Sequence, residues 1–339
     1  MITSQKKKST TERNSWRSMS RFTDFPIDNQ WVTSHRKKKN RVDPYRPYAW
    51  FVEKEYREPG LIEDVSTILL TNNECPYRCL MCDLWKNTTD KPVPHGAIPE
   101  QIRFALSRQT PTKHLKLYNS GSFFDKKAIP EDDYREIASL IEDFDTVTVE
   151  SHPFFIGKNT LQFQELIKPA LQVAIGLETI HPEILPRLNK NMDLADFEHS
   201  VTYLASHGMT SRAFILLRPP FLSEPEGILW AKKSIDYAFS VGVATCFVIP
   251  VRSGNGALDV LKGGKYFEEP DIKSLERVIE YGIKQEAGPV FADLWDIDNF
   301  SSCGICLEMR KKRLSQMNLN QKTYPPITCS CRDDRSGKS

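Results

Sequence analysis

The 339-residue sequence has no uninterrupted apolar run near the roughly 20 residues that a membrane-spanning helix needs. Its first residues are basic and polar rather than an apolar h-region, so neither a signal peptide nor a membrane anchor is indicated. The seven histidines show no metal-binding spacing, and no glycine-rich loop of the phosphate-binding type occurs. These absences argue against secretion, a membrane partner and a histidine-based metal site.

Cysteine, in contrast, is frequent. Eight cysteines in a large chain without a secretory signal indicate metal ligands or reactive thiols rather than disulfides. A reducing, cytoplasmic compartment is therefore predicted. The chain is long enough for one barrel with appendages or for two domains.

Three of the cysteines stand within eight residues, in the segment Cys75-Pro-Tyr-Arg-Cys79-Leu-Met-Cys82. Three thiolates at this spacing can bind three irons of a cubane iron–sulfur cluster, which normally takes four cysteine ligands. No further cysteine follows before Cys246. One iron would therefore stay open to a ligand other than protein, as the open position of a catalytic metal site does.

Positive charge is concentrated near the N-terminus. Residues 1–48 contain 12 Lys/Arg and 4 Asp/Glu, a net charge of +8, whereas the rest contains 34 and 40, a net charge of −6. Because this basic segment has little apolar periodicity, residues 1–43 are predicted to form a largely disordered arm. Such an arm can bind a nucleic-acid backbone, or it can be a solvated tail.

From residue 44 onward, strand-like and helix-like segments alternate, which is the pattern of a parallel α/β fold. The expected strands are Val65–Leu70, Leu115–Tyr118, Thr146–Val149, Gln172–Ile175, Ala213–Leu217 and Ala244–Ile249. Polar residues follow each strand directly, and a β/α barrel carries its functional groups at that position. Six strand–helix units, fewer than a closed barrel has, predict a partial, laterally open (β/α)6 TIM-type barrel over residues 44–290. A small cysteine-bearing lobe is expected over 291–339.

The spacing Cys75-x3-Cys79-x2-Cys82 after a first strand resembles the signature of the radical S-adenosylmethionine (radical SAM) superfamily. The sequence from Asn73 to Thr88 is similar to that of one branch, the radical SAM subunit of archaeosine synthase and its uncharacterised bacterial relatives. The segments Gly176–Thr179 and Arg218–Glu224 support the same branch. The likeness extends over about residues 44–331.

This resemblance implies a 4Fe–4S cluster bound by Cys75, Cys79 and Cys82. It further implies that the amino and carboxylate groups of S-adenosylmethionine chelate the open iron. A reduced cluster would cleave the cofactor to a 5′-deoxyadenosyl radical, which abstracts hydrogen from a substrate. An electron donor such as a flavodoxin or ferredoxin is the implied partner.

The resemblance also places cofactor contacts at the ends of the next three strands. Asn119, Ser120, Gly121 and Ser122 stand where the family has a glycine-rich segment facing the methionine amino group, and Gly121 allows close backbone approach. Glu150 and Ser151 match an acidic position that meets the cofactor, and Glu178 matches another. The alternative for both glutamates is a salt bridge at the barrel rim.

One position departs from the family pattern. The residue before the last cysteine of the motif is usually aromatic and lies beside the adenine, whereas here it is Met81, whose thioether can also pack against a ring. The apolar side chains of Leu80, Leu84 and Trp85 are expected to shield the cluster.

A second cysteine set, Cys303, Cys306, Cys329 and Cys331, lies near the C-terminus. Two cysteine pairs can complete a tetrahedral zinc site. The Cys-x-Cys half suits an auxiliary iron–sulfur cluster as well, and unligated thiols are the third possibility. The lone Cys246 lies in an apolar strand and is expected to be a core residue.

The leading functional hypothesis is a radical SAM enzyme that modifies a nucleoside in tRNA or another RNA. The branch resemblance, the basic arm and the cationic C-terminal lobe favour it. The alternatives are a radical SAM enzyme acting on a protein or small molecule, a non-catalytic iron–sulfur electron-transfer protein, and a zinc-based RNA-binding adaptor. Electron transfer predicts a cluster without cofactor cleavage, and the adaptor predicts zinc at the first cysteine set. No catalytic residue is assigned.

Overall fold

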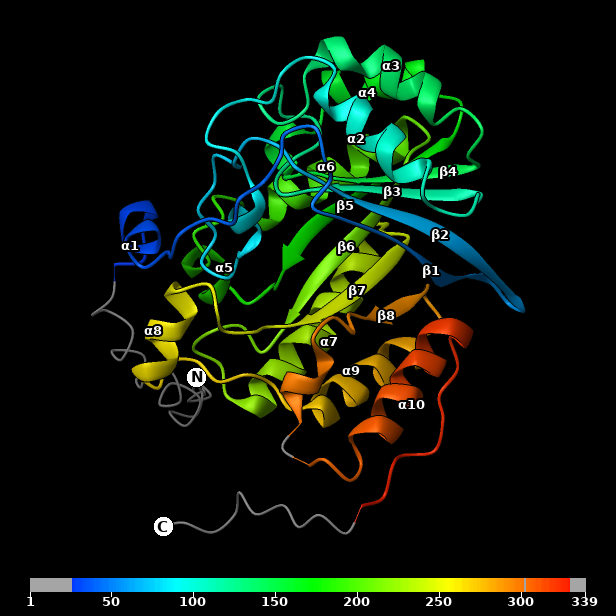
Figure 1. The fold of residues 1–339 in the computed structure, drawn as a ribbon. Helices are drawn as coiled ribbons and strands as arrows, with labels where there is room; N and C mark the ends of the chain where they lie inside the picture. Colours follow the sequence, from blue (N-terminus) through cyan, green and yellow to red (C-terminus); the bar gives the residue numbers. More distant parts are fainter. Residues whose placement is uncertain (1–25, 302, 330–339) are drawn as a thin grey trace, which may run out of the picture.

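A computed structural model describes residues 26–301 and 303–329 of the chain. Within these residues a single sheet contains eight strands in the sequential order β1 to β8 (Figure 1). The strands are β1 Ala49–Glu58, β2 Leu61–Leu70, β3 His114–Asn119, β4 Thr146–Glu150, β5 Ala170–Glu178, β6 Thr210–Leu217, β7 Thr245–Pro250 and β8 Val290–Ala292. β1 and β2 pair antiparallel, and each later pair is parallel.

Helices connect the parallel strands and cover the outside of the curved sheet (Figure 1). The α-helices are α1 Asn29–Ser34, α2 Ala97–Leu106, α3 Tyr134–Leu140, α4 Lys158–Leu166, α5 Ile184–Arg187, α6 Leu194–Ser206, α7 Glu224–Ser240, α8 Ala257–Gly263, α9 Ile272–Lys284 and α10 Leu307–Asn320. Short 3-10 turns occur at Leu84–Asn87, Glu131–Asp133, Pro153–Phe155 and Ile297–Phe300. No helix in the described part of the chain is long and apolar enough to span a bilayer.

The two faces of the sheet differ because successive side chains of a strand point to opposite sides. Leu117, Val149 and Ile215 belong to the main hydrophobic core, which the outer helices complete. The side chains between such residues face the inside of the curve, where Tyr118 and Phe214 lie edge to face, with ring centroids 6.1 Å apart. The molecule is thus a half-barrel with an apolar outer core and a partly polar interior.

The predicted architecture is confirmed: the chain forms an open half-barrel with an α/β fold, and each of the six expected strands is present. Two further strands were not expected. β1 forms an antiparallel hairpin with β2, and the short β8 extends the sheet beyond β7. Both stand at the edges of the sheet.

α10 contacts both edge strands, β1 and β8. The side-chain amide of Asn318 accepts a hydrogen bond from the Ala292 N–H and donates one to the Ala292 carbonyl, at 2.8 and 2.9 Å. The amide of Gln321 pairs in the same way with the backbone of Val290, at 2.8 and 3.1 Å. Two side chains therefore satisfy the backbone groups that a further strand would otherwise pair with.

The expected start of the ordered chain, near residue 44, needs a correction. Residues 1–25 of the predicted arm lie outside the described residues, but residues 26–43 contain α1 and contact the barrel. The Asp28 carboxylate caps α1 by accepting a hydrogen bond from the Trp31 N–H at 2.7 Å. Val32 is buried in a second hydrophobic cluster, which is separate from the main core. The local sequence hides these contacts because they are made with residues distant in the chain.

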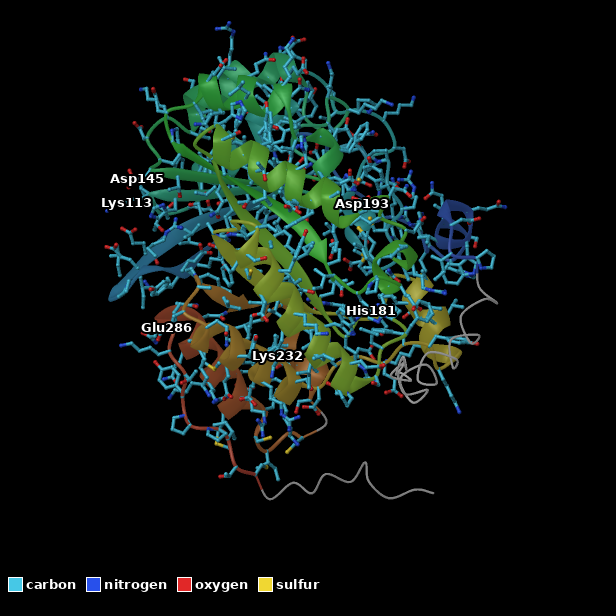
Figure 2. The ribbon with its side chains drawn as sticks, turned by 180° about the vertical axis from the view of Figure 1, so that it is seen from behind. Lys113, Asp145, His181, Asp193, Lys232 and Glu286 are labelled. Atoms are coloured by element: carbon cyan, nitrogen blue, oxygen red, sulfur yellow. The ribbon has the colours of Figure 1, made fainter. Side chains whose placement is uncertain are left out.

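The parallel strands share one direction, so their C-terminal ends lie together. Figure 2 shows Lys113 and Asp145, which precede β3 and β4, at one end of the sheet, and His181 and Asp193, which follow β5, at the other. The loop containing the first cysteine set also follows the C-terminal end of a strand, β2.

Candidate metal and cofactor site

The first cysteine set occupies the loop between β2 and the 3-10 turn at Leu84–Asn87. Cys75, Cys79 and Cys82 are each half-buried. The expected apolar shield is present at Leu80 and Trp85, which are buried, whereas Leu84 is exposed and so does not contribute. Met81 is partly buried and packs against the second hydrophobic cluster.

Two other loops form hydrogen bonds with the backbone of this cysteine loop. The Leu80 N–H donates to the Leu188 carbonyl at 2.8 Å, so the loop after α5 supports it. The side-chain amide of Asn255, in the loop after β7, donates to the carbonyls of Leu80 and Cys82 at 2.8 and 3.2 Å. The loop is therefore held from both sides by segments that follow later strands.

The segment after α1 supplies a third support. Glu74, next to the first cysteine, forms ion pairs with Arg36 at 2.6 Å and Lys39 at 2.7 Å. The Arg36 guanidinium also lies over the Trp85 ring, 4.9 Å from its centroid. Two cations of the predicted basic arm thus neutralise a carboxylate of the cysteine loop.

Burial raises the pKa of all three thiols, and for Cys82 it raises the pKa to about 12. A positive metal centre reverses this, because a coordinating thiol is deprotonated. Among the described residues, one group of three candidate ligands has every donor atom within 4.8 Å of the others, and that group is the C-terminal set. The sulfurs of the first set are therefore more widely spread. This spread fits thiolates bound to separate irons better than thiolates around a single ion.

The end of β3 lies directly against the cysteine loop. A Cβ atom added at Gly121 would lie 3.4 Å from the Cβ of Cys75, so a side chain there would crowd the loop. The Ser120 N–H donates to the Asn72 side-chain oxygen at 3.2 Å. The amide nitrogen and oxygen of buried Asn119 have no hydrogen-bond partner within the described structure. Such orphaned groups fit a site that receives a polar ligand.

At the end of β4, Glu150 faces the interior. Burial raises the pKa of its carboxyl group to about 8. Ser151 is buried, and its hydroxyl donates to the His152 carbonyl at 3.1 Å. The Ser122 hydroxyl accepts from the His152 N–H at 2.9 Å, which ties the β3 and β4 ends together.

His152 links this end of the sheet to the cysteine loop. Its ring stacks on that of Tyr77, with centroids 3.9 Å apart, and its Nε2 lies 2.9 Å from the Lys190 carbonyl. Burial lowers the pKa of the imidazole to about 4, so the ring is neutral at physiological pH.

The end of β5 contains a charged pair that sequence reasoning missed in part. Glu178 forms a buried ion pair with Lys190, which precedes α6 and also donates to the Gly176 carbonyl at 2.5 Å. A Cβ at Gly176 would overlap both charged groups, so glycine makes room for the pair. Glu178 thus forms a salt bridge, which was the alternative to a cofactor contact at this position. In the sequence, Lys190 stands out only as part of the polar run Asn189–Asn191, which follows an apolar segment. The neighbouring residues do not show that its side chain is buried.

The C-terminal set is also brought together. Cys303, Cys306 and Cys329 meet in the group described above, and Cys331 lies outside the described residues. Cys246 is fully buried in β7, as its apolar surroundings predicted.

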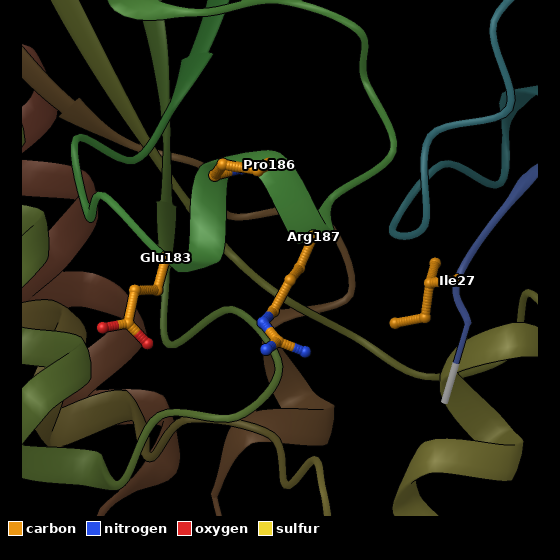
Figure 3. A pocket seen from close by; sticks show the side chains of 4 residues that line it. All are labelled: Ile27, Glu183, Pro186 and Arg187. Carbon is orange, nitrogen blue, oxygen red and sulfur yellow. The ribbon is translucent and has the colours of Figure 1, made fainter. Parts of the chain in front are cut away.

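A surface pocket lies between α5 and the segment before α1 (Figure 3). Ile27, Glu183, Pro186 and Arg187 line it. It contains one acidic and one basic side chain and no cysteine, so it offers no evident ligand set for a metal.

Comparison with known proteins is consistent with this picture. No protein-family model matches the chain. An uncharacterised protein of Methanocaldococcus jannaschii is 22% identical over 324 residues, covering 88% of each chain. Archaeosine synthase subunit beta of Methanosarcina acetivorans is 28% identical over 182 residues, which cover 50% of this chain and 53% of that subunit, about half its length. The crystal structure of methylornithine synthase aligns over 80% of this chain and 77% of its own with a TM-score of 0.51 and 11% identity, which is a likeness of fold.

The chain is thus an open half-barrel with three cysteines in the loop after its first parallel strand. The relatives in sequence include archaeosine synthase beta subunits and the uncharacterised M. jannaschii protein. The resemblance predicted from the cysteine loop is confirmed. A 4Fe–4S cluster and S-adenosylmethionine are the cofactors that this resemblance implies. Which residues of this chain hold them stays a prediction.

Proposed function

We propose that this chain is a radical SAM enzyme that binds its 4Fe–4S cluster through Cys75, Cys79 and Cys82. The observation that carries the proposal is the convergence of this loop with the ends of β3, β4 and β5, where Asn119, Glu150 and the Glu178–Lys190 pair lie. When bound and reduced, the cluster supplies the electron that cleaves S-adenosylmethionine to a 5′-deoxyadenosyl radical.

The residues around the loop suit a ligand with both a cationic and an anionic group. Glu150 has its pKa raised by burial, so a nearby ammonium group would favour its charged form. The unpartnered amide of Asn119 can both donate and accept hydrogen bonds. Met81, Ser120, Gly121, Ser122, Ser151 and Glu178 remain our further candidates for cofactor contacts. The half-barrel interior would keep water from a radical.

Anaerobic reconstitution with iron and sulfide, followed by dithionite and S-adenosylmethionine, tests this proposal. The wild-type protein should release 5′-deoxyadenosine, and the Cys75→Ser, Cys79→Ser and Cys82→Ser variants should not. Cys246→Ala is the matched control because Cys246 lies in the core of β7. A brown protein that never cleaves the cofactor would instead identify an electron-transfer protein. Zinc without iron at the first cysteine set would indicate the structural adaptor.

For the substrate, we propose a nucleoside in tRNA or another RNA. Support comes from the relatives, since archaeosine synthase subunits act on tRNA. Lys37 and Lys38 stand between Arg36 and Lys39 in the segment that contacts the cysteine loop. Both are exposed and are available to a phosphate backbone. Arg36 and Lys39 are expected to contribute less, because both already form ion pairs with Glu74. We place the activity in the cytoplasm, with a flavodoxin or ferredoxin as electron donor.

Mass spectrometry of tRNA nucleosides from a strain lacking this protein tests the substrate. A nucleoside that disappears in the deletion strain and returns with the wild-type gene, but not with Cys79→Ser, is the expected result. An unchanged nucleoside profile would point to a protein or small-molecule substrate. In binding assays, Lys37→Ala/Lys38→Ala should weaken RNA affinity and flatten its dependence on salt.

A further inference from the structure

The C-terminal cysteines form a compact sulfur site. Cys303 and Cys306 stand immediately before α10, and Cys329 follows the segment that runs back after it. All three sulfurs lie within 4.8 Å of one another, and those of Cys303 and Cys329 are 3.8 Å apart. The group therefore joins two segments that are separated in sequence by the whole helix.

The sulfur spacing indicates a single metal ion. Tetrahedral coordination with Zn–S bonds of about 2.3 Å places two sulfur ligands about 3.8 Å apart. In a cubane 4Fe–4S cluster each thiolate binds its own iron, so the sulfur ligands are held further apart than those of a single ion. A purely sulfur ligand set in tetrahedral geometry is typical of zinc, and structural zinc sites are four-coordinate.

Neighbouring side chains support the sulfur ligands. The Arg310 guanidinium donates to the Cys306 sulfur through Nε at 3.3 Å and forms a buried ion pair with Glu276 of α9. Its Nη2 donates to the Ile327 carbonyl at 3.1 Å, two residues before Cys329. These contacts fix the positions of Cys306 and of the backbone next to Cys329, as hydrogen-bond partners of metal ligands do.

The returning segment is held along α10 by a second arginine. Arg313 donates to the carbonyls of Tyr324 and Pro325, at 2.9 Å for the latter, and forms ion pairs with Glu276 and Glu280. The path from α10 back to Cys329 is therefore defined by side chains that serve no part of the radical site.

We propose that Cys303, Cys306 and Cys329 bind one structural Zn²⁺ that fastens the N-terminal end of α10 to the segment returning from its C-terminal end. Structural zinc sites are four-coordinate, so one further ligand would complete the three thiolates. α10 covers the open side of the half-barrel through Asn318 and Gln321, so the zinc ion stabilises this cover. The proposal is independent of whether the chain cleaves S-adenosylmethionine.

Elemental analysis of anaerobically purified protein separates the two cysteine sets. About one zinc per chain is expected both in the wild type and in a Cys75→Ser/Cys79→Ser/Cys82→Ser variant, which should contain no iron. Cys303→Ser/Cys306→Ser should lose the zinc and keep the iron, and Cys246→Ala should keep both. Iron and acid-labile sulfide retained by the first triple variant would overturn the proposal in favour of an auxiliary cluster. Zinc unchanged in the C-terminal variant would also overturn it.

A measurement on the unmodified protein covers the case in which the C-terminal variant does not fold. The X-ray absorption spectrum at the zinc edge should show a shell of sulfur alone at about 2.3 Å. A shell dominated by nitrogen or oxygen would contradict the assignment. Removal of the zinc by a chelator should also speed proteolysis within residues 301–329 relative to the barrel, because the returning segment is then released.

Discussion

At the residue scale, Lys190 is the side chain on which the candidate site most depends for its charge balance. It is buried with Glu178, and nothing else of opposite charge is paired with that carboxylate in the described residues. Lys190→Met should therefore leave a buried, unpaired carboxylate and reduce the free energy of unfolding by about 3–5 kcal/mol. Guanidinium denaturation of the apo-protein measures this.

The double variant Glu178→Gln/Lys190→Met is the control for this prediction. It removes both charges, so it should recover a large part of the lost stability. If the double variant were as unstable as the single one, packing of the lysine stem, and not its charge, would be the cause.

Glu150 gives a prediction for pH dependence. Burial raises its pKa from the ordinary 4.5 to about 8, so the folded chain holds a proton that the unfolded chain has released between these values. Folding stability should therefore fall as pH rises from about 4.5 to about 8. Glu150→Gln lacks this loss, so its stability advantage over the wild type should be absent at acid pH and full above pH 8. Urea denaturation along a pH series measures the difference.

The exposed Glu142 supplies the matched control, because it forms only a surface ion pair with Lys168. Glu142→Gln should stay within about 1 kcal/mol of the wild type across the series. A constant difference between Glu150→Gln and the wild type at every pH would mean that Glu150 does not titrate abnormally.

At the scale of elements, α10 replaces a strand that the sheet lacks. The amides of Asn318 and Gln321 satisfy both backbone groups of Ala292 and Val290 on the free edge of β8. Asn318→Leu should leave two of these groups unpaired and cost about 1–3 kcal/mol for each that stays buried. Hydrogen exchange at the Ala292 amide should accelerate, whereas Asn320→Leu, which contacts only the Gln316 carbonyl, should change neither quantity much.

α1 and the residues after it give a second prediction at this scale. Deleting residues 1–43 removes the Arg36 and Lys39 partners of Glu74, and should lower the iron content after reconstitution and speed cluster loss in air. Deleting residues 1–25 leaves these contacts and should leave the iron content unchanged. Equal iron content in both deletions would show that the ion pairs do not support the cysteine loop.

The elements that the sequence predicted are those whose signal is local. The six inner parallel strands have closely spaced apolar residues, and polar residues follow each one, so both the strands and their functional ends can be predicted from the sequence. β8 has three residues and depends on amides of α10, which no window of sequence contains. Lys190 is likewise defined by its distant partner Glu178. The cysteine loop could be recognised from the sequence because the spacing of its three cysteines is a local feature. The residues that support it, Asn255 and Arg36, come from segments distant in the chain and could not be recognised in this way.

At the scale of the whole molecule, the interior of the half-barrel is divided along its axis. Asn119, Glu150 and Glu178 end their strands and lie with the cysteine loop at one end. Lys116 and Arg212 occur early in β3 and β6, and both pair with Glu55 of β1. This buried charged layer joins three strands across the interior and fills it at the end away from the cysteines. A ligand of the cysteine site is therefore expected to enter from the end of the half-barrel at which the cysteines lie.

Replacing this charged layer tests whether its charges add to the stability of the fold, or whether each charge is needed only because its buried partners would otherwise be unpaired. Arg212→Met leaves Glu55 with Lys116 and the more distant Arg57, and should cost about 3–5 kcal/mol. Glu55→Leu/Lys116→Met/Arg212→Met should be close to the wild type or more stable. The cations hold the pKa of Glu55 well below its usual range, so the wild type should lose stability as pH falls below about 4.5, and the triple variant should lose less. Urea denaturation at pH 7 and pH 4 measures both effects. A triple variant as unstable as Arg212→Met, with the same loss in acid, would mean that the layer holds the strands together by specific hydrogen bonds that apolar side chains cannot replace.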